Sequence, residues 1–139
     1  NYDFIIYDNS PTFSPLVESS IYSSDYLLMP ASATYGAHLV LEKNLNRILD
    51  FCDATEKNLK KVWLVPTLLE NNKISRQVLA SYVTNYSQFI TTATIRRTVK
   101  GAEAVARSIS PVENDPMSPL SQDYMNLLDE LLRGIKDGY

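Results

Sequence analysis

The chain has 139 residues, a formal net charge of −3, 45% hydrophobic and 21% charged residues. This length is enough for one domain with a substantial core. The mildly acidic net charge excludes a protein whose whole surface is basic and binds nucleic acid, but it does not exclude a local basic patch. No apolar run approaches the ~20 residues that a membrane-spanning helix needs, and the single cysteine excludes an internal disulfide.

The first half of the chain alternates short apolar runs with helical patterns. Residues 4–7 form an apolar run that predicts a buried strand of the kind found in parallel sheets, and residues 26–29 predict a second one. Residues 15–24 predict a short helix between them, and residues 31–36 a small polar loop. A helix over residues 37–53 is predicted by apolar residues on one helical face, namely Leu41, Leu45, Ile48, Leu49 and Cys52.

The second half continues this alternation after a basic linker. Residues 62–65 predict a third strand and the β-branched residues 91–95 a fourth. Between them we expect a helix with one apolar face, which comprises Ile74, Val78, Tyr82 and Tyr86. Residues 100–108 predict a short helix, and the proline-rich residues 110–119 a loop. The last helix has Ser118 as its cap and an apolar stripe of Leu120, Tyr124, Leu127, Leu128, Leu131, Leu132 and Ile135.

Strands that alternate with helices imply right-handed βαβ crossovers. We therefore predict one α/β domain over residues 1–139, with three layers and a mostly parallel sheet covered by helices on both faces. Ligands bind such sheets beyond the carboxyl ends of the strands. We expect three segments to lie there, residues 8–11, 30–35 and 95–100.

Asp8 is the first candidate for a chemical role, because it directly follows a predicted buried strand. In P-loop nucleotidases such an aspartate holds Mg²⁺, often through water. Many strands end in Asp, so a turn or cap residue explains the same spacing. A receiver-like domain with Asp8 as phospho-acceptor needs an acidic pair at another strand end, and Asp3 lies at the start of the same strand.

Several motifs follow one another in register along nearly the whole chain. They are YDFIIYDNSP at residues 2–11, SDYLLMP at 24–30 followed by Tyr35, ISRQV at 74–78, and IRRTVK at 95–100 followed by Glu103, Ala104, Pro111, Asp115 and Pro116. Their order resembles the ParA/MinD-type (deviant Walker A) ATPases from Walker B and switch II to the last helix. The resemblance implies a partial P-loop NTPase-like fold, with ATP and Mg²⁺ as cofactors of the intact protein.

The resemblance also implies roles for single residues. Asp8 would serve Mg²⁺ and the attacking water, Pro11 would shape switch II, and Arg97 and Thr98 would line the adenine side of the pocket. Ser10 and Arg96 stand where the family usually has proline. No K-G-G-x-G-K-[ST] phosphate loop occurs, because the four glycines, Gly36, Gly101, Gly134 and Gly138, are scattered. Alone, the chain should therefore not bind ATP tightly or hydrolyse it.

The chain starts without Met, so we expect a piece of a longer polypeptide, and a natural pseudo-ATPase that has become a non-catalytic interaction module is the alternative. The resemblance implies plasmid or chromosome partition in the cytoplasm on the nucleoid, by an ATP-dependent homodimer with a ParB-like or centromere-binding adaptor. The last helix is too acidic for an anionic membrane, which favours the branch that binds DNA non-specifically. The DNA candidates are Arg76, Arg96, Arg97, Lys100 and Arg107, and a solvated loop with ordinary ion pairs explains them equally well.

Overall fold

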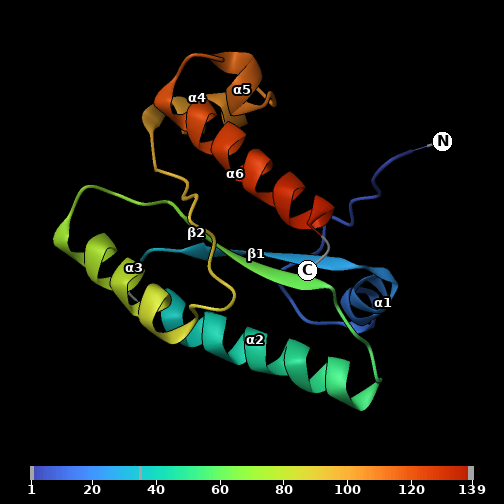
Figure 1. Ribbon diagram of the computed structural model, residues 1–139. Helices are drawn as coiled ribbons and strands as arrows, with labels where there is room; N and C mark the ends of the chain where they lie inside the picture. Colours follow the sequence, from blue (N-terminus) through green and yellow to red (C-terminus); the bar gives the residue numbers. More distant parts are fainter. Residues whose placement is uncertain (1, 35, 138–139) are drawn as a thin grey trace.

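The computed structural model describes residues 2–34 and 36–137, so Tyr35, which the resemblance matched to an aromatic position, lies outside the described residues. Helices and strands alternate through the first half of the chain and helices alone follow (Figure 1). In order, the elements are α1 (Pro15–Ser23), β1 (Tyr26–Ser32), α2 (Ala37–Ala54), β2 (Lys61–Thr67), α3 (Lys73–Asn85), α4 (Val99–Ala106), α5 (Pro111–Asn114) and α6 (Pro119–Lys136).

The sheet consists of β1 and β2, which run parallel with Tyr26 opposite Lys61 and Ser32 opposite Thr67. Two of the predicted strands are therefore confirmed, and α2 between them is the expected crossover helix. The five residues from Val62 to Pro66 in β2 are all buried, whereas β1 is only partly buried. β2 is the more buried strand because residues 90–96 flank it on the side away from β1, whereas the other edge of β1 is unpaired in the described part of the chain.

The prediction of a continuous strand over residues 91–95 is wrong. Residues 90–96 lie beside β2 and the loop that follows it, joined by two isolated parallel bridges, Leu64 with Ile90 and Leu69 with Arg96, and by the Ile95 amide, which donates to the Pro66 carbonyl at 2.8 Å. Between the bridges the ladder is interrupted, because Pro66 of β2 has no N–H to donate and the Thr92 and Ala93 amides donate to the Glu130 carboxylate of α6 at 2.9 and 2.8 Å. The carboxylate thus satisfies backbone donors that are not paired with β2.

The prediction of a strand at residues 4–7 is also wrong. In the part of the chain that the structure describes, no backbone hydrogen bond joins residues 2–13 to the sheet. Phe4 is 57% exposed and Ile6 88%. A strand needs a neighbour for its backbone donors and acceptors, and this segment has none, so Asp8 does not follow a strand.

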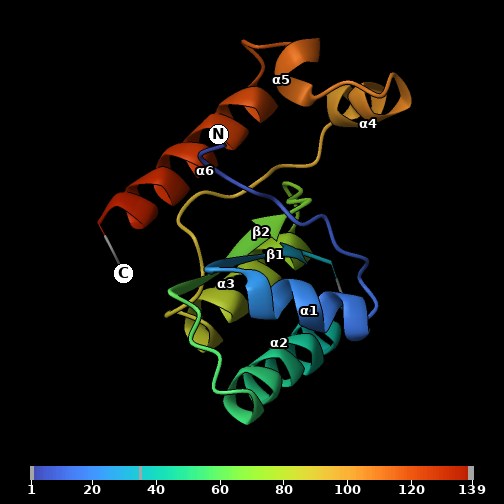
Figure 2. The ribbon, with the colours of Figure 1, turned by 90° about the vertical axis from the view of Figure 1, so that its right-hand side faces the viewer.

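Helices nevertheless cover both faces of the sheet, as predicted for an α/β domain. Successive side chains of β2 point to opposite faces. Leu64 packs with Leu41 of α2 and Tyr82 of α3, and Val65 packs on the other face with Leu120 and Leu127 of α6. Figures 1 and 2 show α2 and α3 on one side of the sheet and α6 on the other.

Side-chain caps determine where the later helices begin. The Asn72, Thr98 and Ser118 side chains accept hydrogen bonds from the first turns of α3, α4 and α6. The predicted loop over residues 110–119 contains the one-turn helix α5, because Ser110 and Glu113 form a reciprocal capping box. Among the described helices, none combines the length and apolarity needed to cross a membrane.

Candidate functional site

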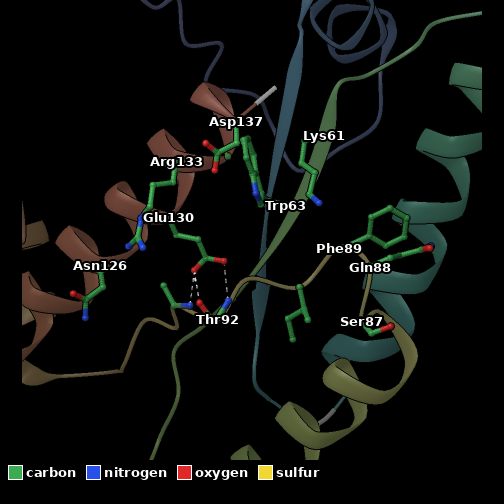
Figure 3. A pocket seen from close by; sticks show the side chains of 13 residues that line it. Lys61, Trp63, Ser87, Gln88, Phe89, Thr92, Asn126, Glu130, Arg133 and Asp137 are labelled. Carbon is green, nitrogen blue, oxygen red and sulfur yellow. Dashed lines mark hydrogen bonds between the residues drawn. The ribbon is translucent and has the colours of Figure 1, made fainter. Parts of the chain in front are cut away.

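Two cavities lie at opposite ends of β2. The larger, of about 670 Å³, lies at the amino end beside Lys61 and Trp63 (Figure 3). Its central carboxylate, that of Glu130, is engaged by Thr92 and Ala93 rather than free. Ligands of parallel α/β sheets bind at the carboxyl ends of the strands, so this larger cavity is the weaker candidate.

The smaller cavity, of about 400 Å³, lies just beyond the carboxyl end of β2. It opens between the loop that follows β2 and the segment that runs beside β2, with one residue from α6. Its lining combines one apolar residue with polar and charged groups, namely Leu69, Glu70, Asn71, Thr94, Arg96, Arg97 and Asp123. Its position and size fit a small-molecule site.

Backbone hydrogen bonds hold the two walls of this cavity together. The Leu69 amide donates to the Ile95 carbonyl at 3.1 Å, and the Arg97 amide donates to the Leu69 carbonyl at 2.8 Å. An ion pair adds to them, since Arg97 Nη1 lies 3.0 Å from Glu70 Oε1. Because the side-chain Nδ2 of Asn72 donates to Glu70 Oε2 at 2.9 Å, Glu70 and Arg97 have restricted orientations.

The charged pair Arg96–Asp123 forms the third side of the cavity. Asp123 Oδ2 accepts from the Arg96 backbone amide at 3.0 Å and from Nε at 2.7 Å, while Oδ1 accepts from Nη2 at 2.8 Å. The Asp123 side chain is only 10% exposed and that of Arg96 50%. The hydrogen bond to Asp123 raises the pKa of Arg96 above its ordinary value, so the guanidinium remains positively charged at every physiological pH.

Curated proteins similar to this chain include two proteins of partition and division. It is 23% identical over 141 residues to the cell division protein PomZ of Myxococcus xanthus, which covers 94% of this chain and 41% of PomZ. It is 21% identical over 137 residues to the chromosome-partitioning ATPase Soj of Thermus thermophilus, covering 98% of this chain and 55% of Soj. The chain is a distant homologue of ParA/MinD-family partition ATPases.

The chain spans about half the length of the curated relatives it matches. No protein-family profile matches it. The similarity to these ParA/MinD-family proteins agrees with the resemblance inferred from the motifs, and it extends over nearly all of this sequence.

The structure brings only part of the predicted ParA/MinD-type site together. Arg97 lines the cavity at the carboxyl end of β2, whereas the Thr98 hydroxyl caps α4 by accepting from the Gly101 amide at 3.0 Å. Asp8 and Pro11 are exposed on the segment that precedes α1 and are not among the residues that line the cavity. Asn9, which follows Asp8, is hydrogen-bonded to α1: its Oδ1 accepts from the Ser20 hydroxyl at 2.7 Å.

The side chains that the structure describes do not form a complete magnesium site. Within residues 2–34 and 36–137, no group of three or more His, Cys, Asp or Glu side chains is placed to hold a metal. Mg²⁺ in nucleotide sites commonly takes only one or two carboxylates and otherwise water and phosphate oxygens. Asp8 alone is therefore compatible with this ion only together with ligands that a nucleotide would bring.

The predicted DNA-binding residues do not form one patch. Arg76 lies on α3, across the sheet from α4, which carries Lys100 and is followed by Arg107 (Figure 2). Three of the five cations have carboxylate partners: Arg96 pairs with Asp123, Arg97 with Glu70 and Lys100 with Asp115. Arg107 donates to Asn114 at 3.3 Å, and the exposed Arg76 side chain has no partner in the described part of the chain.

The sequence-based site omitted five residues that line the cavity, namely Leu69, Glu70, Asn71, Thr94 and Asp123. A signal for Asp123 was present. It falls three residues after Leu120 and four before Leu127, on the face of α6 that packs against the sheet. A carboxylate within an apolar helical stripe requires a buried cation or several hydrogen-bond donors, and the nearby arginines were candidates.

Proposed function

We propose that this chain is the C-terminal part of a ParA-like ATPase that acts in plasmid or chromosome partition. The observation that carries the proposal is the cavity at the carboxyl end of β2 with Arg97 in its wall, in a chain similar to partition ATPases over more than nine tenths of its length. In this function, the chain contributes the base side of an ATP pocket, and polypeptide outside this sequence contributes the phosphate loop.

The groups around the cavity suit a purine base. The planar Arg97 guanidinium, held by Glu70 at 3.0 Å, can stack on an aromatic ring. The Asn71 amide and the Thr94 hydroxyl can donate to and accept from the base edge. Leu69 offers an apolar contact. This combination of one apolar surface and a few oriented polar groups is typical of cofactor sites.

Asp8 is the proposed ligand of Mg²⁺ and of the attacking water, with Pro11 shaping its loop. Within the described residues, the Asp8 carboxylate makes no hydrogen bond and no ion pair, which leaves it available. When bound to ATP, Mg²⁺ would neutralise the charge that develops during phosphoryl transfer. The chain's own contribution is to present the carboxylate, while Asn9 anchors the adjacent backbone to α1.

The free edge of β1 supports a sheet that continues in additional polypeptide. β1 pairs only with β2 in the described part of the chain, and Leu28 on it is 44% exposed. The apolar residues 4–7 are exposed as well. An additional parallel strand between β1 and residues 4–7 would pair with the free edge of β1 and bury residues 4–7. Asp8 would then lie at the carboxyl edge of the larger sheet.

DNA binding, homodimerisation and an adaptor of the ParB-like or centromere-binding class complete the proposal. Arg76 and Arg107 support non-specific contact with DNA phosphates, because neither is paired with a carboxylate in the described structure. Lys100, Arg96 and Arg97 belong to the predicted set too, but they must compete with Asp115, Asp123 and Glu70 for any phosphate. The proposed site of action is the nucleoid in the cytoplasm.

The test uses the full-length polypeptide that contains this sequence. We expect ATP hydrolysis, and we expect Asp8→Ala to abolish it while the far-ultraviolet circular dichroism stays unchanged. Unchanged hydrolysis in Asp8→Ala would refute the role of Asp8. If the full-length sequence lacks a G-K-[ST] loop and does not bind ATP, the non-catalytic interaction module is correct instead.

A further inference from the structure

Two carboxylates of α6 hold the segment that runs beside β2. Asp123 accepts three hydrogen bonds from Arg96, and Glu130, two helical turns later, accepts three from Thr92 and Ala93. Two isolated bridges and the Ile95 amide, which donates to the Pro66 carbonyl at 2.8 Å, connect this segment to β2 and the loop that follows it. The helix therefore adds restraint where the segment lacks the continuous ladder of a regular strand.

The two attachments lie at different places. Glu130 faces the larger cavity at the amino end of β2, as Figure 3 shows. Asp123 lines the smaller cavity at the carboxyl end, next to Arg96 and Arg97. Asp123 is thus the attachment that acts on the wall of the proposed nucleotide pocket, and Glu130 is a natural control for effects on the segment as a whole.

The Asp123 carboxylate has little capacity left for a ligand. Its Oδ2 accepts two hydrogen bonds and its Oδ1 a third, at 2.7 to 3.0 Å. It is also nearly buried, and an incompletely paired carboxylate at such a position is costly. The bond to the Arg96 backbone amide constrains the backbone directly before Arg97, independently of where the arginine side chain points.

We propose that Asp123 is a positioning residue for nucleotide-base binding, which acts through Arg96 to hold residues 94–97 in the shape that forms the pocket wall. This inference rests on the proposed function. Asp123 itself does not contact the nucleotide. It determines the direction in which the neighbouring Arg97 and Thr94 face the cavity, while the base contacts are made by those residues.

The experiment compares Asp123→Asn and Glu130→Gln in the full-length polypeptide. Asparagine keeps the shape of the side chain but turns one acceptor into a donor that faces the donors of Arg96. Calorimetry measures the affinity for ATP and, as a probe without a base, for tripolyphosphate. Hydrogen exchange measures the protection of the Arg96 and Arg97 amides.

We expect Asp123→Asn to weaken ATP binding about tenfold and to leave tripolyphosphate binding within about twofold. The amides of Arg96 and Arg97 should lose protection. Glu130→Gln should leave ATP affinity unchanged and reduce protection only near Thr92 and Ala93. If Asp123→Asn binds ATP like the wild type, or if both ligands weaken equally, the positioning role is wrong.

Failure of the proposed function gives a different result. In that case, the wild-type full-length protein binds neither ATP nor tripolyphosphate. The hydrogen-exchange comparison is independent of nucleotide: unchanged protection at Arg96 and Arg97 in Asp123→Asn refutes the restraint itself, and lost protection confirms it.

Discussion

The hydroxyl of Tyr82 should stabilise the carboxyl end of β1. Tyr82 is fully buried in the core between the sheet, α2 and α3, and its hydroxyl donates to the Ser32 carbonyl at 2.9 Å. Burial of the ring raises the pKa of Tyr82 above its ordinary value, so the hydroxyl remains protonated and can donate throughout the neutral range. Tyr82→Phe removes this donor and leaves a carbonyl of β1 without its partner.

The expected loss of stability follows from this geometry. The ring remains, so no large cavity forms, and the cost is that of one hydrogen bond with a partly buried acceptor, about 1–2 kcal/mol. Urea denaturation of a domain of this size has a slope of about 1–3 kcal/mol per molar urea. With a slope near the middle of this range, about 2 kcal/mol per molar urea, the midpoint should fall by roughly 0.5–1 M with an unchanged slope.

A matched control comes from Tyr86, one helical turn further along the chain. Its ring lies 6.2 Å from that of Tyr82, and its hydroxyl donates no hydrogen bond in the described structure. Tyr86→Phe should change stability by less than about 0.5 kcal/mol. Equal midpoints for Tyr82→Phe and Tyr86→Phe would refute the reasoning, because both variants remove a hydroxyl oxygen and only that of Tyr82 donates a hydrogen bond in the described structure.

Two further outcomes are expected. The ion pair of Lys100 with Asp115 lowers the pKa of Asp115 and raises that of Lys100. Its stabilisation should therefore be present at neutral pH, disappear as pH falls below about 4 through the lowered pKa of Asp115, and disappear again as pH rises through the raised pKa of Lys100. Melting curves of wild type and Asp115→Asn should differ at pH 7 and converge on acidification, and a gap that persists at pH 2 would exclude this cause. Charge reversal at Arg76 and Arg107 in the full-length protein should weaken DNA retention in gel shifts and reduce its salt dependence, whereas equal retention would contradict their role.

Local pattern was sufficient for much of the fold. Three elements were predicted close to their observed bounds: β2 from its run of buried apolar residues, α2 from its apolar face and α6 from its apolar stripe. In each case the pattern lies within the element itself. Caps such as Ser118 act within one turn, so the start of α6 was predictable as well. The short range of these interactions is the physical reason for the success.

The candidate site was predictable only in part. The motif containing Arg97 led to the cavity at the carboxyl end of β2, because parallel strands bring their carboxyl ends to one edge. Glu70, which binds Arg97, and Asp123, which binds Arg96, each lie 27 positions along the sequence from their arginine. No local period connects such positions, so sequence reasoning assigned Arg96 and Arg97 to DNA without their ion-pair partners.

By itself, the sequence determined the parallel α/β alternation, the bounds of α2 and α6 and the distant relationship to partition ATPases, since these depend on local periodicity and ordered motifs. Tertiary structure alone decided which apolar runs became strands. Residues 91–95 form no continuous ladder because Pro66 has no N–H to donate and the Glu130 carboxylate accepts from the Thr92 and Ala93 amides. Residues 4–7 formed no strand because, in the described part of the chain, no neighbouring backbone pairs with them. A strand exists only where a second chain segment satisfies its backbone, and that depends on what lies beside it in space.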